Sequence, residues 1–570
     1  MTKNLYRLFF KERLVELFHK DTIDSFRIRN HNAFTLLIEC KEVVMDWQNA
    51  NLKNYDTVKH CIEEVQEAVK KDVILTFKIC SKTIFDHILS ECSNRGEKER
   101  NIFKKLIYYI DAIVCENKEH YLYLLFQKID YFVCSDYEEE TFPTDKFIEF
   151  DHLISALATQ LMYIGFSKYY IFHLSNTFDV YQFEDSYSNF KQTICNRTKL
   201  NKAVIVKLAI GEKENKIVSL MQLVNEVPKK YVNEQILMRF ASYLRPNKNF
   251  NFFIFETTSD TDSYSTAKKA REIIAKKLDM LHLNNNLLKV EIPKYALVTY
   301  KNDNGQTRFE YVKEFYIDGT YNNNDPTLFS TINSLMEKPN IDKEVSMRLS
   351  SALRHLRIGN CQSDIEQQFV NYWIALEFIF SSAEANESTF SRVKTNIINI
   401  FVSCYIKRNI LYLDSLLKKE NILSTEETIF DATTLKKAES NSKISVLLLY
   451  RLKIIEPIII GNSDKRKNYI KAHETNLAQH ISRIYRLRNK LIHEAAIKQN
   501  IANITSDLRY YLVFVINQMI SYYNEQSTKS DKKLCMEDMF FEYDMVTRCI
   551  KENFNLDILR DVHFDNTYLS

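Results

Sequence analysis

The stretch RIYRLRNKLIHEA, Arg483 to Ala495, has the apolar rhythm of a core helix and carries charges inside that rhythm. Apolar residues recur at intervals of three and four, which predicts an amphipathic helix from about Glu474 to Ile497. Arg488 stands within the apolar stripe, with Ile484 and Leu491 at the neighbouring positions. An unpaired buried charge is costly, so this guanidinium must find an acceptor. The segment therefore predicts a core helix that holds either an ion pair or a chemical site.

A candidate acceptor lies in an earlier segment, DIEQQFVNYWIALEFIFSS, which begins at Asp364. Glu377 has Trp373 and Phe380 at its four- and three-residue spacings, so this carboxylate also lies on an apolar face. We expect Glu377, Arg488 and Tyr485 to form a polar cluster, buried in the core or at an interface. The alternative is an inter-helix salt bridge with no chemical role.

The composition predicts a largely helical globular protein. The chain of 570 residues is long enough for about two to four domains. It contains only 7 Gly and 7 Pro, which disfavours an all-β architecture built on many tight turns. With 77 basic against 74 acidic side chains, its charge is too balanced for a nucleic-acid coat or a polybasic membrane anchor. Any contact with nucleic acid must come from a local patch.

The distribution of cysteines and apolar runs indicates a cytoplasmic protein. The 11 cysteines are scattered singly, with no C-x-x-C pair and no histidine at metal-ligand spacing. We therefore expect free thiols in a reducing compartment and no metal site. The N-terminal segment is too charged for a signal peptide, and no apolar run approaches the ~18 residues that span a bilayer. No membrane contact is expected.

Changes of pattern divide the chain into four regions. Helical spacing dominates the beginning, the middle mixes strands with helices, and helical spacing returns from about residue 340 to the end. The turn-rich segment TYNNNDPT, Thr320 to Thr327, is the predicted boundary after the middle region. The regions are a helical N-terminal region (1–135), an α+β middle domain with a sensor or regulatory role (136–335), a helical bundle (340–525) and a helical extension (526–570).

Local signals predict individual elements. Asn302 to Gly305 is a hairpin turn, because Asn and Gly tolerate positive φ. Capping-box patterns at Ser363/Glu366 and Ser424/Glu427 predict helix starts. The remaining elements are strands in Asn201–Gly211 and Asn251–Thr258, strands in ALVTYK and RFEYV on either side of the turn, and a helix from Ser265 to Leu283 opened by a serine cap.

Arginine–histidine spacing alone does not select a site. An arginine precedes a histidine by five to seven residues at Arg13/His19, Arg348/His355, Arg466/His473, Arg486/His493 and Arg488/His493. Among these arginines, Arg488 alone stands on an apolar face with Asn489 directly after it, His493 beyond it and a candidate carboxylate elsewhere. Placement therefore favours Arg488, Asn489 and His493 as the candidate site.

The segment RNKLIH on a late helix, following the aromatic-rich helix that carries Glu377, resembles the HEPN superfamily. It is most similar to the Apea-like HEPN domains of bacterial antiviral and toxin proteins, over about residues 340–525. The resemblance implies a helical bundle that dimerises and acts as an RNA endonuclease without metal or cofactor. It places the motif arginine at Arg488, the polar neighbour at Asn489 and the histidine at His493, with Glu377 at the acidic position. It also implies a setting in bacterial defence, as an abortive-infection or toxin-like protein. The regions before residue 340 would sense a phage-derived trigger or restrain the nuclease.

The residues fit that chemistry. His493 can transfer a proton near neutral pH, and Arg488 can stabilise charge that develops on a phosphate. Asn489 can orient the phosphate or the imidazole. Arg488 and His493 are five residues apart, which is about 140° around a helix with its ~3.6-residue period. Bringing both to one phosphate therefore favours a bend, the long reach of arginine, or a homodimer with a two-fold axis near this helix.

Basic residues gather around the motif. Arg483, Arg486 and Lys490 are expected to bind the RNA backbone. The alternative for such a run of charges is a solvated helix face. Two further functions compete with the ribonuclease: a non-catalytic HEPN module that binds RNA or a nucleotide, and a dimerisation scaffold in which Glu377 and Arg488 only fix the helix register.

Overall fold

A computed structural model describes most of the chain. The residues outside the description are 1–4, 20–21, 28–30, 53, 96–97, 100, 135–141, 180–181, 211–214, 283–289, 302–304, 313–325, 363, 382–386, 462, 495–500, 530 and 553–570. For Asp24, Asn215, His282, residues 326–328, Ser463, His493 and Glu494 only the backbone is described.

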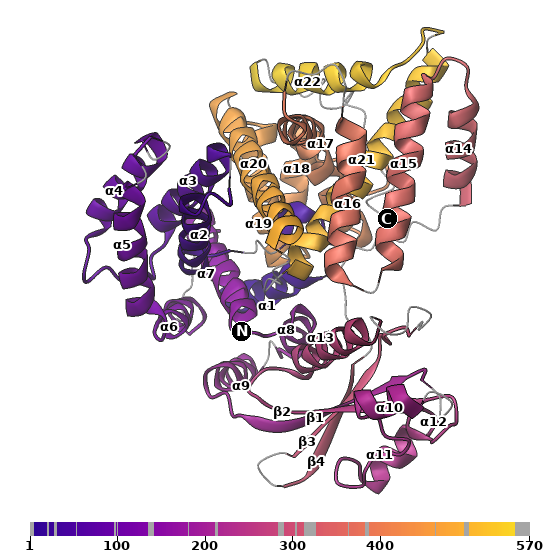
Figure 1. The fold of residues 1–570 in the computed structure, drawn as a ribbon. Helices are drawn as coiled ribbons and strands as arrows, with labels where there is room; N and C mark the ends of the chain where they lie inside the picture. The colour runs from indigo at the N-terminus through magenta and orange to yellow at the C-terminus, as the bar shows by residue number, and fades with distance from the viewer. Residues whose placement is uncertain are drawn as a thin grey trace. The chain divides into compact units, whose positions relative to one another are not determined.

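The described chain is mainly helical and carries one four-stranded antiparallel sheet in its middle region (Figure 1). This confirms the predicted fold class, mainly α with an α+β middle region. The chain divides into two compact units. One consists of residues 1–156 together with 317–570, and the other of residues 157–316. The N-terminal helices and the C-terminal half thus belong to one unit.

The N-terminal part of the larger unit is built from helices. They are α1 (Leu5–Phe18), the short η1 (Asp24–Phe26), α2 (Ala33–Gln48), α3 (Tyr55–Lys71), α4 (Lys82–Arg95), α5 (Ile102–Asn117), α6 (Tyr121–Val133) and α7 (Thr144–Tyr163), the last of which continues into the second unit. Helices α2 to α5 share a core that includes Leu37, Val65 and Phe85. Asn32 caps α2 in a reciprocal capping box with Thr35, which satisfies two backbone donors at the helix start.

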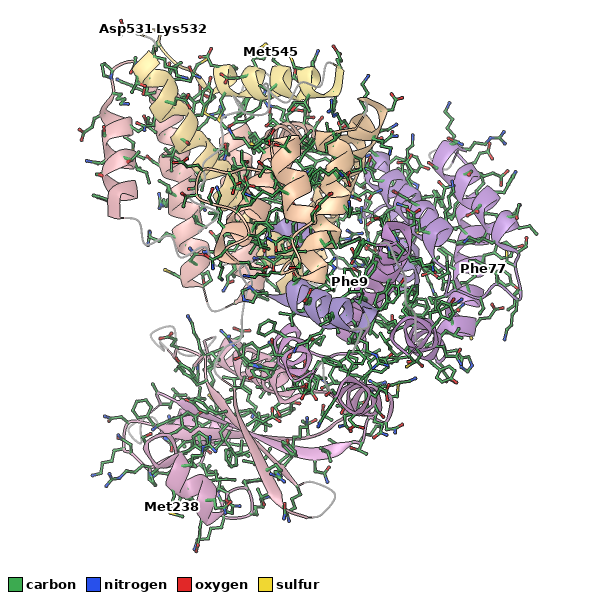
Figure 2. All side chains as sticks on the ribbon, turned by 180° about the vertical axis from the view of Figure 1, so that it is seen from behind. Phe9, Phe77, Met238, Asp531, Lys532 and Met545 are labelled. Atoms are coloured by element: carbon green, nitrogen blue, oxygen red, sulfur yellow. The ribbon has the colours of Figure 1, made fainter. Side chains whose placement is uncertain are left out.

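The C-terminal part holds the largest hydrophobic core. Its helices are α14 (Pro326–Glu337), α15 (Lys343–Cys361), α16 (Ile365–Phe380), α17 (Thr389–Lys419), α18 (Ala432–Glu439), α19 (Val446–Ile459), α20 (Ser463–Glu494), α21 (Ile501–Lys529) and α22 (Met536–Glu552). Helix α16 packs against α15, α17, α20 and α21 (Figure 1). Phe9 of α1 is buried in this unit, whereas Met545 of α22 is exposed (Figure 2).

Close packing of α16 against α15 depends on a glycine. A Cβ at Gly359 would meet the ring of Tyr372 at 2.5 Å, so a larger side chain there would push the two helices apart. The Tyr372 hydroxyl donates to Asn360 Oδ1 at 2.8 Å, which fixes the same contact. Tyr372 and Trp373 are both fully buried. Helix α16 is therefore held rigidly where it presents Glu377 to α20.

The starts of three predicted helices differ from the sequence patterns. Asp364 caps α16, and Ser363 lies outside the described residues. At the second predicted capping box the Ser424 backbone N–H donates to Glu427 at 2.8 Å, yet the next helix, α18, begins at Ala432 with Asp431 as its cap. Asp262, not Ser265, accepts the first backbone donors of α13, which begins at Ser263. In each case the side chain of an aspartate, also a favoured capping residue, accepts the backbone hydrogen bond at the helix start.

The smaller unit is an α+β domain. Its sheet has the order β2-β1-β3-β4, with every neighbouring pair antiparallel, and is formed by β1 (Leu200–Leu208), β2 (Asn251–Ser259), β3 (Ala296–Lys301) and β4 (Thr307–Val312). Alternate residues of β1 face opposite sides, so Val204 joins a core with α13 (Ser263–His282) and Ile205 joins another with α11 and α12. The other helices are α8 (Lys168–Asn176), α9 (Phe183–Cys195), α10 (Asn215–Met221), α11 (Glu234–Arg239) and α12 (Ala241–Leu244).

The predicted strands and the β3–β4 hairpin are confirmed. Gly305 has a φ of 71°, the left-handed conformation that the turn requires, while residues 302–304 lie outside the described part. Most of the predicted boundary segment, residues 320–325, also lies outside it, and Pro326 begins α14. No helix among the described residues is long and apolar enough to cross a membrane.

Candidate functional site

Helix α20 carries the motif and begins earlier than the sequence pattern predicts. It runs from Ser463 to Glu494, whereas the apolar periodicity indicates a start near Glu474. The extra turns carry mostly polar residues, including Lys465, Arg466 and Lys467, so their apolar signal is weak. Arg466 donates to the carbonyls of Ile458 and Ile459 of α19, which fixes the first turns of α20.

The structure brings Arg488 and Glu377 together. Arg488 Nη2 lies 3.5 Å from Glu377 Oε1, and the two side chains are 25% and 27% exposed. Trp373 donates its indole N–H to the same Glu377 oxygen at 2.6 Å. Arg488 Nη1 donates to Asn489 Oδ1 at 3.2 Å. The guanidinium is thus anchored on two sides while a quarter of the side chain still meets solvent.

The pair is not fully satisfied. Arg488 Nε is buried and has no hydrogen-bond partner among the described residues. At 3.5 Å the Arg488–Glu377 contact is also longer than a strong charge-assisted hydrogen bond, which is about 2.7–2.9 Å. A guanidinium held this loosely keeps donors that a second anion could bind.

The aromatic ring of Tyr485 packs against two aromatic rings near the Arg488–Glu377 pair. Its ring stacks on Phe390 of α17 with centroids 4.0 Å apart, and it lies 5.9 Å from the Trp373 ring. Tyr485 therefore contacts the cluster through its ring, which positions α20 against α16 and α17. The prediction placed Tyr485 in the polar cluster, whereas the contacts observed for it are those of its ring with Phe390 and Trp373.

His493 is described only as backbone within the last turn of α20. The catalytic role predicted for its imidazole therefore stays a prediction. By helical register it lies seven residues after Arg486, about 20° around the helix axis from that residue. Arg488 is about 140° away from it by the same ~3.6-residue period. One copy of α20 thus places Arg488 and His493 on different faces.

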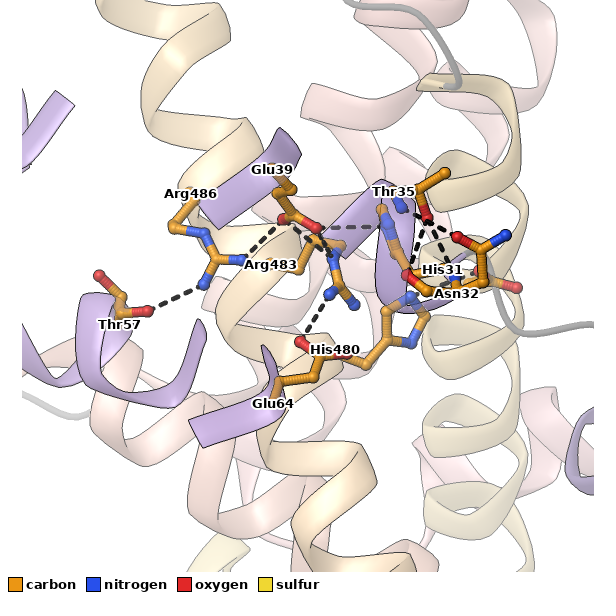
Figure 3. A network of polar contacts seen from close by, with 10 residues as sticks. His31, Asn32, Thr35, Glu39, Thr57, Glu64, His480, Arg483 and Arg486 are labelled. Carbon is orange, nitrogen blue, oxygen red and sulfur yellow. Dashed lines mark hydrogen bonds and ion pairs between the residues drawn. The ribbon is translucent and has the colours of Figure 1, made fainter. Parts of the chain in front are cut away.

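Arg483 and Arg486, predicted to bind RNA, face the N-terminal helices instead (Figure 3). Arg483 Nε lies 2.9 Å from Glu39 Oε2, and Arg483 Nη2 lies 2.6 Å from Glu64 Oε2. Arg486 Nη2 lies 2.8 Å from Glu39 Oε1, and Arg486 Nη1 donates to the Thr57 carbonyl at 3.0 Å. Both arginine side chains are only 7% exposed. In this conformation neither guanidinium is open to an RNA phosphate, and neither forms a solvated face.

Lys490, the third predicted RNA-binding residue, follows the same pattern. Its ammonium group lies 3.3 Å from Asp46 Oδ2 of α2, and both side chains are about one-fifth exposed, at 19% and 21%. Earlier in the same helix, the hydroxyl oxygen of Ser482 lies 3.0 Å from His60 Nδ1 of α3. One face of α20 is therefore covered by α2 and α3.

The charges in this network are strongly coupled. Burial alone would raise the pKa of the Glu39 carboxyl, but Arg483, His31 and Arg486 hold that pKa well below its usual value. The pKa of Arg483 is raised: burial opposes the shift, and the carboxylates of Glu39 and Glu64 outweigh it. Burial, with Arg483 second, lowers the pKa of His31 to about 4. Glu39 and Arg483 are therefore charged at neutral pH, and His31 is neutral.

Acidification is expected to weaken this network through His31. An unfolded histidine binds its proton near pH 6.5, whereas folded His31 does so only near pH 4. Between these values the unfolded state holds more protons, so stability is complete above this window and is lost as the pH falls through it. From pH 7 to pH 5 we expect a loss of about 1–2 kcal/mol from this group. Thermal unfolding at both pH values checks this, with His31→Gln losing less stability than the parent. An equal loss in both proteins would contradict it.

The sequence patterns did not identify Glu39, Glu64 and Asp46 as partners of α20. Glu39 and Asp46 lie on α2 beside apolar residues, a placement similar to the one that drew attention to Glu377. That signal indicates a charge at an interface, but not which of the basic residues it meets.

Among the described residues, no group of three or more His, Cys, Asp and Glu side chains is arranged to hold a metal ion. No protein-family model, no curated protein and no solved structure matches this chain.

Proposed function

We propose that the chain is a metal-independent endoribonuclease of the HEPN type, with Arg488, Asn489 and His493 as its catalytic residues. The observation that carries the proposal is the state of Arg488. It is anchored by Glu377 and Asn489, a quarter exposed, and only loosely paired, at 3.5 Å. A cation held in this way can bind a phosphate oxygen without first breaking a tight buried ion pair. The setting proposed with it is bacterial antiviral defence, in which the nuclease acts as an abortive-infection or toxin-like protein in the cytoplasm.

The proposed reaction needs only the RNA and these side chains. The ribose 2′-oxygen attacks the adjacent phosphorus, and the bond from phosphorus to the 5′-oxygen breaks. The neutral imidazole of His493 accepts the 2′ proton, and a protonated imidazole donates one to the leaving 5′-oxygen. Arg488 stabilises the charge that grows on the phosphate oxygens. The products are a 2′,3′-cyclic phosphate and a 5′-hydroxyl.

A homodimer suits this chemistry. Because Arg488 and His493 lie about 140° apart on one helix, a two-fold arrangement of two α20 helices would offer one phosphate an arginine from one copy and a histidine from the other. Two histidines near neutral pH would also supply one base and one acid.

Incubation of purified protein with RNA in excess chelator tests the proposal. We expect cleavage to continue with EDTA, because no step uses a metal, and the new ends to be 2′,3′-cyclic phosphates and 5′-hydroxyls. Gel electrophoresis with end-group analysis measures both. Cleavage that stops in EDTA, or new ends with 5′-phosphates, would contradict the mechanism. Binding of RNA without products would instead favour a non-catalytic RNA-binding module.

A structural scaffold is the second candidate, and the bond from Trp373 to Glu377 favours it. A carboxylate that accepts from both Trp373 and Arg488 fixes the register of α16 against α20. In that case RNA would be neither bound nor cut. Glu377→Gln would then lower the thermal stability and change nothing else.

A further inference from the structure

The basic residues of α20 form a stripe that is paired with acids from α2 and α3. Arg483, Arg486 and Lys490 are three and four residues apart, so they share one face of the helix. Their partners are Glu39 and Asp46 from α2 and Glu64 from α3. Each basic residue of this stripe thus contacts at least one carboxylate from another part of the chain.

Glu39 bridges the two arginines of this stripe. Its Oε2 lies 2.9 Å from Arg483 Nε, and its Oε1 lies 2.8 Å from Arg486 Nη2 (Figure 3). Guanidinium groups bind carboxylate oxygens and phosphate oxygens through the same kind of charge-assisted N–H···O hydrogen bonds, so a carboxylate and a phosphate can compete for them. Glu64 occupies a further donor of Arg483 at 2.6 Å. The donors named here are therefore already paired with carboxylates, while Arg486 Nε is buried and has no hydrogen-bond partner among the described residues.

The covered stripe leads to the predicted catalytic histidine. His493 lies three residues after Lys490 and seven after Arg486, which places its backbone in register with the stripe. RNA that reached His493 along α20 would pass the positions that α2 and α3 now occupy. The carboxylates would also repel its phosphates.

We propose that α2 and α3 form an acidic cover that weakens the binding of RNA to α20, so that this conformation is the less active form of the nuclease. The inference rests on the proposed function, because it identifies the RNA-binding surface of the same site and what controls it. The ligand that competes with the cover is the phosphate backbone of single-stranded RNA. For RNA to reach the stripe, α2 and α3 must move away from it while α20 stays packed in the C-terminal helices.

Charge-matched variants test the cover. Asp46→Lys removes the partly exposed carboxylate that pairs with Lys490. Its control is Asp111→Lys, which makes the same change at an exposed aspartate of α5 that pairs with Lys41. Glu39→Gln/Glu64→Gln weakens the centre of the cover. Its control, Glu67→Gln/Asp111→Asn, removes two exposed carboxylates. In each comparison the change in net charge is equal, so non-specific attraction cancels.

The readout is binding of a single-stranded RNA oligonucleotide, followed by fluorescence anisotropy against salt concentration. We expect each cover variant to bind about tenfold more tightly than its control near 0.1 M salt. The logarithm of its affinity should also fall more steeply with the logarithm of salt concentration, by about 0.7 for each further phosphate that the protein neutralises. Faster amide exchange in α2 and α3 should accompany this. Equal affinity of Asp46→Lys and Asp111→Lys, with both proteins folded, would overturn the cover. The comparison of Asp46→Lys with Asp111→Lys tests the cover even if the Glu39→Gln/Glu64→Gln variant does not fold.

Adding His493→Ala to each variant separates this inference from the proposed function. If the cover variants bind RNA more tightly but no protein cuts it, the acidic cover is supported and the proposed ribonuclease activity is refuted. The opposite result has two parts: the parent cuts RNA while His493→Ala does not, and the cover variants bind RNA no more tightly than their controls. That result would support the ribonuclease and refute the acidic cover.

Discussion

RNA cleavage by the His493→Ala variant is expected to fall by about 10²–10⁴-fold, because the variant has no group to move the 2′ proton. His493 lies in the last turn of α20, and alanine is the strongest helix former, so we expect the helix content and thermal midpoint to stay unchanged. A gel of total cellular RNA after induction of each protein measures the effect together with the class of RNA that is cut. Normal cleavage by the variant would refute the proposed mechanism.

Arg488→Ala is expected to lose cleavage to a similar degree, and Arg488→Lys to recover only part of it. Lysine restores the charge but not the planar fork that binds two phosphate oxygens together. Arg548→Ala is the matched control, because it removes an arginine side chain that is 71% exposed and lies outside the site. It should keep most of the cleavage. Full activity of Arg488→Ala would exclude a role for this arginine on phosphate.

The second large effect is expected in a buried charge cluster that contributes to stability. Arg451 of α19 bonds Glu16 of α1 at 2.6 Å, and Arg13 of α1 bonds Glu16 at 2.7 Å and Asp151 of α7 at 2.6 Å. Asp151 also accepts from the Tyr450 hydroxyl at 3.0 Å. Burial would raise the pKa of Asp151, but Arg13 and Arg451 bring it down to about 2. Two cations and two anions therefore balance in the interior.

Arg451→Ala is expected to destabilise the protein by about 3–5 kcal/mol, because it leaves a buried carboxylate without its partner. It also removes a guanidinium that packs 4.2 Å from the centre of the Phe26 ring. Denaturant unfolding followed by tryptophan fluorescence and by circular dichroism measures the change.

The control is Arg548→Ala, which breaks an ion pair whose arginine side chain is 71% exposed. Exposed pairs contribute about 0–1 kcal/mol, so this variant should resemble the parent. If Arg451→Ala is no less stable than Arg548→Ala, the buried cluster does not hold α1 against α19.

The sequence by itself indicated which segments are helices or strands, although not where every helix begins, and it indicated one inter-helix contact. Apolar periodicity is a local property, so it identified the C-terminal helices, the strands of the middle region and the hairpin whose turn ends at Gly305. The same periodicity placed Arg488 and Glu377 on apolar faces. The structure sets them 3.5 Å apart although 111 positions separate them in the chain. Opposite charges on buried faces have few alternatives to pairing, which is why this contact could be predicted.

Only the tertiary structure decided the environment of the other basic residues. The local pattern around Arg483, Arg486 and Lys490 is the same whether the residues meet water, RNA or another helix. Their acidic partners lie more than 400 positions away, on helices in which no spacing rule connects them to α20. Charge pairing at such separations is set by how helices pack, and packing depends on the shape of the whole core. The sequence therefore specified a basic helix, and the fold determined that the N-terminal helices cover it.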